Sequence, residues 1–151
     1  MTEIEKTDIP RSMPAWMAVG TPIAVMAVIF FLSSRSQLPD LDGSRDVQSV
    51  AGHFFAYAAL GASLAVFLRW LGWSAVKALL AAIVLATIYG VTDEFHQSFV
   101  PNRQTDVEDL LVDFLGACAG ALAAMQLLDW RDGSASGSSD ADPNRPADGN
   151  S

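Results

Sequence analysis

The chain alternates between long apolar stretches and short polar connections. Residues 15–33 carry no charged side chain, and residues 47–68 carry none apart from His53. Residues 78–92 and 114–128 are two further uncharged runs. A bilayer core of roughly 30 Å takes about 20 helical residues, so the first two stretches are long enough to cross it. The last two are shorter, about 22 Å each at 1.5 Å per residue, and therefore draw on their flanking residues to span.

A soluble helical bundle is the alternative to a membrane protein. Helices of that kind have an apolar stripe and a polar opposite face, whereas these stretches are apolar all round. The pattern therefore predicts an all-α fold, a four-helix transmembrane bundle. The first stretch also differs from a cleaved signal peptide, because residues 1–14 are net negative and no small-residue cleavage site follows it.

Polar composition divides the chain into three parts. We expect a cytoplasmic leader at residues 1–13, a transmembrane domain at 14–130 and a disordered polar tail at 131–151. Six of the nine Lys and Arg residues fall in the leader, the 69–77 connection and the tail. The positive-inside rule then predicts that both termini are cytoplasmic, in a multi-pass protein of the cell membrane.

Composition excludes some partners. The net charge of −8 argues against nucleic-acid binding, and the single cysteine, Cys118, excludes an internal disulfide. Gly116 and Gly120 form a small-residue pair that lets helices approach closely. Packing within the monomer is the favoured use of this pair, and a helix-mediated dimer is the alternative.

Topology brings polar residues to one membrane face. In four alternating helices, the ends of the first and third helices share a level with the starts of the second and fourth. These places hold most of the polar residues with possible chemistry: Ser33, Ser34, His53, Asp93, Glu94, His96, Gln97, Asp106, Asp109 and Asp113, with Arg103 in the last connection. Asp106 and Glu108 also have a simpler explanation, as a helix cap and a solvated surface acid.

Three of the acids are expected below the membrane surface. The shortness of the last two apolar runs draws Asp93, Glu94 and Asp113 towards the hydrocarbon region, where ionisable residues usually face a cavity or a partner. The alternative is a structural pair with His53 or Arg103. His53 itself is a candidate general base or metal ligand, or else a helix–helix hydrogen-bond partner. No metal-binding signature is present, so a divalent cation stays an open possibility.

The ordered motifs resemble those of the VanZ-like membrane proteins over roughly residues 15–128. The residues that carry the resemblance are Leu32-Ser33-Ser34, His53-Phe54-x-x-Tyr57, Tyr89-Gly90-x-x-Asp93-Glu94-x-His96-Gln97, Pro101-x-Arg103-x-x-Asp106-x-x-Asp109 and Gly116-x-x-x-Gly120. The chain departs from the family pattern at Ser49 and Val50, where Asp-Lys is common, and at Asp113, where Asn is common. The resemblance implies a link to glycopeptide (teicoplanin) resistance by family name only, and no defined biochemical activity.

Together, residues and resemblance predict an outward-facing acidic and histidine pocket that binds or processes a lipid-linked or cell-wall-related molecule. In an enzymatic version, the catalytic candidates are Glu94, His53 and Asp93. Arg103 would anchor an anionic headgroup, phosphate above all. Further substrate-binding candidates are Gln97, Asp109, Asp113 and Ser34. The alternative is a non-catalytic cation-binding, transport-like or assembly protein that uses the same acids, and the sequence leaves both open.

Overall fold

The structure, a computed structural model, describes residues 13–35, 45–101 and 107–137 of the chain, without the side chains of 45–49 and 132–137. Four helices account for nearly all of these residues, and the described ranges contain no strand. The helices are α1 (Ala15–Ser33), α2 (Arg45–Trp70), α3 (Ala75–Gln97) and α4 (Val107–Gly137). The prediction of an all-α four-helix fold is confirmed.

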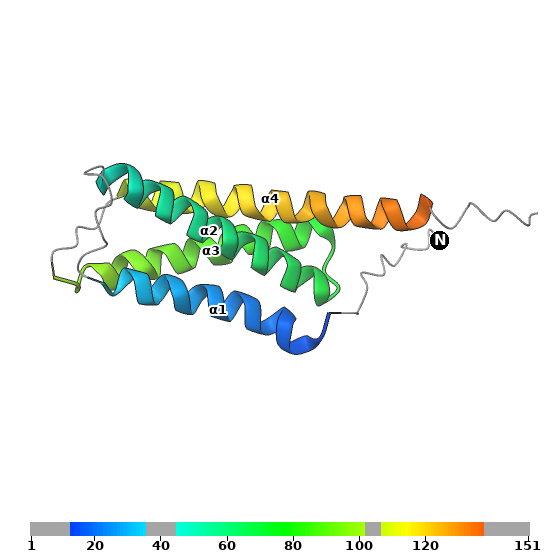
Figure 1. Cartoon of the computed structure of the whole chain (residues 1–151), viewed down its shortest axis with the longest axis horizontal. Coiled ribbons are helices and arrows are strands. Elements are labelled where there is room, and N and C mark those ends of the chain that lie inside the picture. Colours follow the sequence, from blue (N-terminus) through cyan, green and yellow to red (C-terminus); the bar gives the residue numbers. More distant parts are fainter. Residues whose placement is uncertain (1–12, 36–44, 102–106, 138–151) are drawn as a thin grey trace, which may run out of the picture.

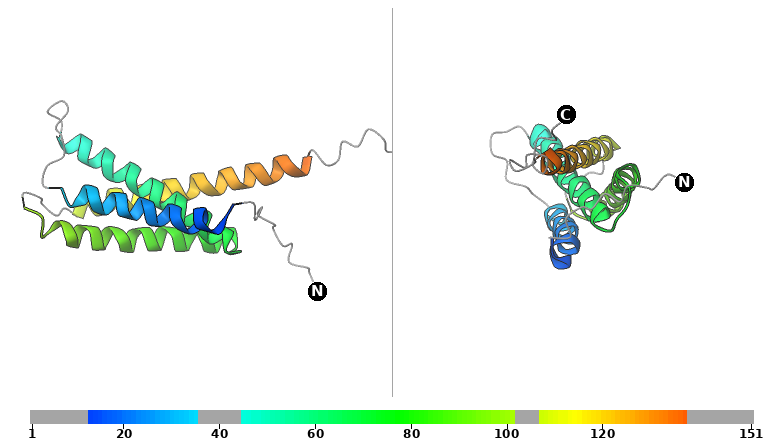
Figure 2. Two further views of the ribbon diagram at one scale, coloured as in Figure 1. Left: turned by 60° about the horizontal axis from the view of Figure 1, so that its bottom comes forward. Right: turned by 90° about the vertical axis from the view of Figure 1, so that its right-hand side faces the viewer.

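The helices alternate in direction, so that α1 begins and α4 ends at the same end of the bundle (Figure 1). Helix α2 is the centre of the packing: it contacts α4 most extensively and also contacts α3 and α1. Helix α1 packs on α2 and α3 alone, without contacting α4 in the described part of the chain. Seen end on, α1 and α4 lie on opposite sides of α2 (Figure 2).

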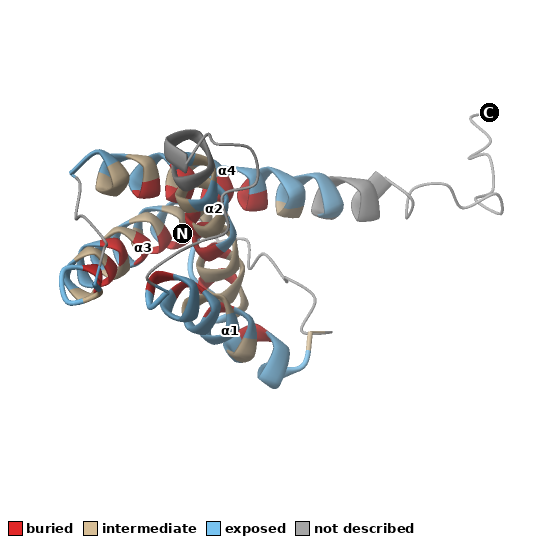
Figure 3. Ribbon diagram, turned by 60° about the vertical axis from the view of Figure 1, so that its left-hand side comes forward, coloured by how far each residue is buried: buried red, intermediate tan, exposed pale blue. Residues whose placement is uncertain are grey.

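The outer surface of the bundle is that of a membrane protein. All four helices are long and apolar enough to cross a bilayer. Exposed residues cover the outward faces in Figure 3, and they include large apolar side chains such as Trp16, Phe55 and Phe95. Such a continuous apolar surface is unfavourable in water and suits contact with lipid. The chain is therefore a multi-pass membrane protein that contacts the lipid bilayer.

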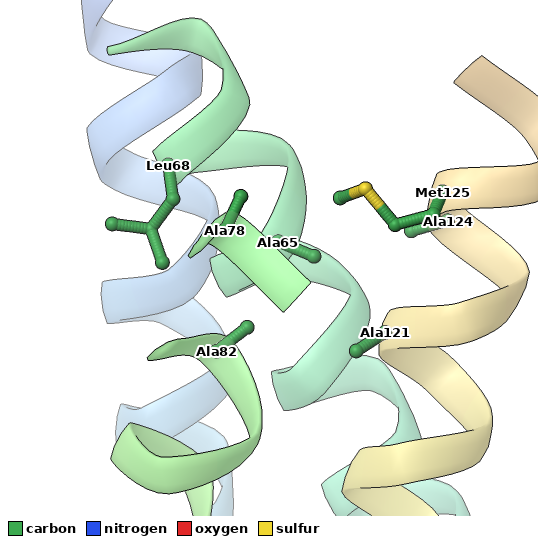
Figure 4. Close-up of a cluster of buried hydrophobic side chains, with 7 residues drawn as sticks. All are labelled: Ala65, Leu68, Ala78, Ala82, Ala121, Ala124 and Met125. Carbon is green, nitrogen blue, oxygen red and sulfur yellow. The ribbon is translucent and has the colours of Figure 1, made fainter. Parts of the chain in front are cut away.

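The end of the bundle where α1 begins, hereafter the apolar end, has a core of small side chains. Its buried residues are Ala65, Leu68, Ala78, Ala82, Ala121, Ala124 and Met125 (Figure 4). Gly120 lies directly against the backbone of Ala58, so that even one added carbon would overlap the Ala58 carbonyl. Gly116 lies in the same way against Phe54. The small-residue pair is thus used within the monomer, between α2 and α4.

The turn after α2 fixes the geometry of this end. Gly72 has φ 87°, a left-handed conformation that favours glycine, and it stops the helix. The Trp73 amide then donates back to the Leu68 carbonyl at 3.1 Å. The Arg69 guanidinium donates to the Trp73 carbonyl at 2.6 Å. The charged group is thereby held beside the end of its own helix.

Two helix ends bear on the sequence predictions. Helix α3 runs through Gln97, the extension that puts Asp93 and Gln97 one turn apart. Helix α4 continues through Gly137, so that residues 131–137, at the start of the expected polar tail, are helical here. Adding residues to an existing helix costs far less than starting one, so the polar Asp and Ser residues there extend α4. Residues 138–151 and the leader up to residue 12 lie outside the described residues.

Candidate functional site

The opposite end of the bundle holds a group of inward-facing polar side chains from all four helices. We call it the polar cluster, and its members are Ser33 of α1, His53 of α2, Asp93, Glu94 and Gln97 of α3, and Asp109 and Asp113 of α4. These residues lie up to eighty positions apart in sequence, and the alternating helix directions bring them to one level.

His53 and Asp113 form the tightest link between α2 and α4. His53 Nδ1 lies 2.9 Å from Asp113 Oδ1, and the Asp113 side chain is completely buried. With Asp113 ionised, its carboxylate can only accept, and Nδ1 then carries the hydrogen while the second ring nitrogen faces elsewhere. That atom, Nε2, lies 3.9 Å from Asp109 Oδ2. A buried acid thus orients the imidazole towards a second acid.

Asp93 organises the other side of the cluster, between α1 and α3. Its Oδ2 accepts hydrogen bonds from Ser33 Oγ at 2.8 Å and from Gln97 Nε2 at 3.0 Å. Asp93 is 3% exposed and Gln97 is 1% exposed. Asp93 and Asp113 are thus buried within the bundle, and their expected position below the membrane surface stays a prediction. Glu94, the third acid, is half-buried.

Glu94 faces the His53–Asp113 pair. One ligand atom from each of His53, Glu94 and Asp113 lies within 4.8 Å of the other two. One imidazole nitrogen with two carboxylate oxygens is a donor set that Zn²⁺, Mn²⁺ and Fe²⁺ accept in proteins. The three residues come from three different helices. A cation bound here would tie α2, α3 and α4 together.

Tyr57 and Gly90 lie between the two halves of the cluster. The Tyr57 ring is nearly parallel to that of His53, with centroids 6.4 Å apart. A side-chain carbon on Gly90 would come within 3.1 Å of Asp113 Oδ2 and 3.3 Å of the Tyr57 ring, so that these side chains would have to shift slightly to accept it. Neither Tyr57 nor Ser33 was assigned a role in the site from the sequence, although Ser33 is among the polar residues expected at this membrane face. Tyr57 follows His53 by one helical turn, and this spacing could have identified it.

Several buried oxygens of the cluster have no hydrogen-bond partner in the described part of the chain. They are the Tyr57 hydroxyl, Asp93 Oδ1, Gln97 Oε1 and Asp113 Oδ2. Buried polar atoms in folded proteins are nearly always paired, and each one left unpaired costs on the order of 1–3 kcal/mol. These oxygens lie close together, where water, another hydrogen-bond donor or a cation could pair with them.

The remaining predicted residues lie outside this cluster. Ser34 is exposed and pairs with His96, their Oγ and Nε2 atoms 3.0 Å apart, so that it does not join the buried group. His96 also stacks on Phe30 at 4.5 Å. Arg103 and Asp106 fall outside the described residues.

A membrane bundle with a buried histidine–carboxylate cluster at one end defines the class of protein. The particular family follows from sequence comparison: a model of the VanZ/LLP1 family matches residues 17–128. The chain belongs to that family, as the motifs predicted. No curated protein and no solved structure matches it.

Proposed function

We propose that this VanZ/LLP1 protein resides in the cell membrane with its polar cluster facing outward, and that the cluster binds or processes a lipid-linked envelope molecule. The buried oxygens without a protein partner beside His53 support the proposal, because buried polar atoms are nearly always paired and a bound donor or cation would pair these. The outward orientation rests on the distribution of Lys and Arg along the chain.

The residues divide into two proposed tasks. His53 Nε2, with Nδ1 held by Asp113, is placed to take a proton from a bound hydroxyl or water, with Glu94 as a second candidate base. Asp93, held by Ser33 and Gln97, supports the α3 side of the pocket.

The polar cluster contains four acids, Asp93, Glu94, Asp109 and Asp113. An anionic headgroup would be repelled by them and therefore needs positive charge nearby. Arg103 lies between Gln97 and Asp109 in the sequence, and a guanidinium binds phosphate through two parallel hydrogen bonds. A protonated His53 or a divalent cation would add further charge. We therefore propose a polyprenyl phosphate, or a sugar carried on one, as the class of ligand.

The test measures binding of a polyprenyl phosphate to the full chain in detergent, with native mass spectrometry as the readout. We expect Arg103→Gln to reduce binding at least roughly tenfold, about 1.4 kcal/mol, and Glu94→Gln to reduce binding when a divalent cation bridges Glu94 and the phosphate. Neither variant should change the melting temperature measured without the cation. Asp129→Asn, which removes an exposed acid at the apolar end, is the matched control. Undiminished binding in both variants would contradict the proposal. If a variant that loses binding also has a lower melting temperature, the substituted residue has a structural role.

The second candidate is a non-catalytic cation-binding protein. It is favoured by one observation, the convergence of ligand atoms from His53, Glu94 and Asp113 within 4.8 Å. In this version the ion holds three helices together, as in a transport-like or assembly protein. Tight binding of a divalent cation without any binding of polyprenyl phosphate would favour it over the first candidate.

A further inference from the structure

A groove of about 690 Å³ runs along the apolar end of the molecule, far from the polar cluster. It lies where α1 and α4 are held apart by α2 (Figure 2). Most of its wall is apolar, contributed by Met17 of α1, Ala62 and Val66 of α2, and Ala123 and Leu127 of α4. Such a wall fits a hydrocarbon chain, and its position among membrane-spanning helices makes lipid the nearest source of one.

Two arginines also line this groove, and one of them is buried. Arg69 is only 6% exposed. Its guanidinium donates one hydrogen bond, to the Trp73 carbonyl, and has further N–H donors available. No acidic residue pairs with Arg69 in the described part of the chain. A buried charge without a counter-charge is costly, so the geometry favours an anion beside it. Arg131 of α4 is exposed and lines the same groove.

The position of Trp70 beside Arg69 suits the depth of lipid headgroups. Trp70 lines the groove, and its indole nitrogen donates to the Met13 carbonyl at 3.2 Å, which joins the end of α2 to the start of α1. Trp residues concentrate at the membrane–water boundary. From Arg69 the groove extends along α2 to Ala62, two turns or about 10 Å towards the bilayer interior.

We propose that this groove binds one anionic phospholipid, with its phosphate on Arg69 and Arg131 and an acyl chain along Ala62 and Val66. A second copy of the chain is the other possible occupant, but an apolar helix would leave the buried guanidinium of Arg69 without a counter-charge. The proposal is independent of the function proposed for the polar cluster, because it concerns other residues at the other end of the bundle.

The experiment measures lipid binding to the full chain by native mass spectrometry and by melting temperature in detergent. Phosphatidylglycerol is the probe, with phosphatidylcholine and inorganic phosphate as comparisons. We expect phosphatidylglycerol alone to bind tightly and to raise the melting temperature. Arg69→Gln should weaken this binding roughly tenfold, about 1.4 kcal/mol, and Arg131→Gln should weaken it less because that side chain is exposed.

Filling the groove tests the acyl chain separately. Ala123→Phe should displace the lipid, whereas Ala119→Phe, on an exposed position of the same helix outside the groove, should not. Lys77→Gln removes an exposed charge at the same end and should leave binding unchanged. Arg131 and Ala123 are both exposed, so their variants keep the test valid if Arg69→Gln fails to fold.

Three results would overturn the proposal. If phosphatidylcholine binds as tightly as phosphatidylglycerol, the net negative charge of the headgroup plays no part in binding. If inorganic phosphate stabilises the protein as much as phosphatidylglycerol does, the acyl chain plays no part in binding. A dimer that Ala123→Phe dissociates, with lipid binding unchanged, would assign the groove to a second copy.

Discussion

The two ends of the bundle are stabilised in different ways. At the apolar end, small side chains and Gly120 let α2 and α4 pack backbone to backbone, and the core there is a cluster of apolar side chains. At the polar end, Ser33, His53 and Gln97 pair with buried acids, and several oxygens nonetheless have no partner in the described residues. Apolar packing requires only complementary shape, whereas a buried polar atom requires a partner. The comparison therefore explains the stability of the first end by packing and supports the ligand site proposed at the second.

The largest effect is expected from crowding the apolar packing. Gly120→Leu forces a side chain into the Ala58 backbone and should lower the free energy of unfolding by about 3 kcal/mol or more. The measurement is melting temperature and membrane abundance. Gly20→Leu is the control, because nothing lies within 4 Å of a side-chain carbon added there. Similar losses from both variants would contradict the packing described for α2 and α4.

A divalent cation should stabilise the polar end. Zn²⁺ or Mn²⁺ at about 100 times its Kd adds ~2.7 kcal/mol to a protein with one site, which appears as a higher melting temperature. Glu94→Gln should abolish this gain and Asp129→Asn should preserve it. If both variants respond to the cation as the parent protein does, the ligand atoms of His53, Glu94 and Asp113 do not form the site.

His53 and Asp113 should be energetically coupled. Single variants His53→Gln and Asp113→Asn, combined in a double-mutant cycle of melting temperatures, should give a coupling free energy of about 0.5–3 kcal/mol. The reason is the 2.9 Å contact between Nδ1 and a fully buried carboxylate. Additive effects of the two substitutions would mean that the pair does not orient the imidazole.

The smallest effect is expected from the two neighbouring serines. Ser33→Ala removes a buried hydrogen bond to Asp93 and should cost about 1 kcal/mol of unfolding free energy. Ser34→Ala removes an exposed contact with His96 and should cost less. Chemical denaturation of the two variants side by side measures the difference. An equal cost for both would argue against Asp93 as the centre of the α1–α3 contact.

Much of the fold follows from the sequence. Uninterrupted apolar runs specify membrane helices, and the first of them, residues 15–33, coincides with α1. The end of α4 is harder to predict, because polar residues such as Arg131 are typical of a tail by composition and yet continue an existing helix at little cost.

For the candidate site, the sequence predicts at which end of the bundle the residues lie but not which side chains face inward. Alternating helices predict that His53, Asp93 and Asp113 share one end of the bundle, and the short apolar runs predict the depth of Asp93 and Asp113 in the membrane. Neither specifies which side chain points inward, and for that reason Ser34 was chosen where Ser33 contacts Asp93. Rotation of a helix about its axis is determined by packing with its neighbours, which a single sequence does not reveal.

The central claim is that the polar cluster is a ligand site and not a self-contained structural element. The most direct measurement is an experimental density map of the full chain with a polyprenyl phosphate present. We predict density for the phosphate, with or without a cation, between His53, Glu94 and Asp109. A map in which these side chains close on one another, with the added lipid bound only elsewhere on the bundle, would contradict the account.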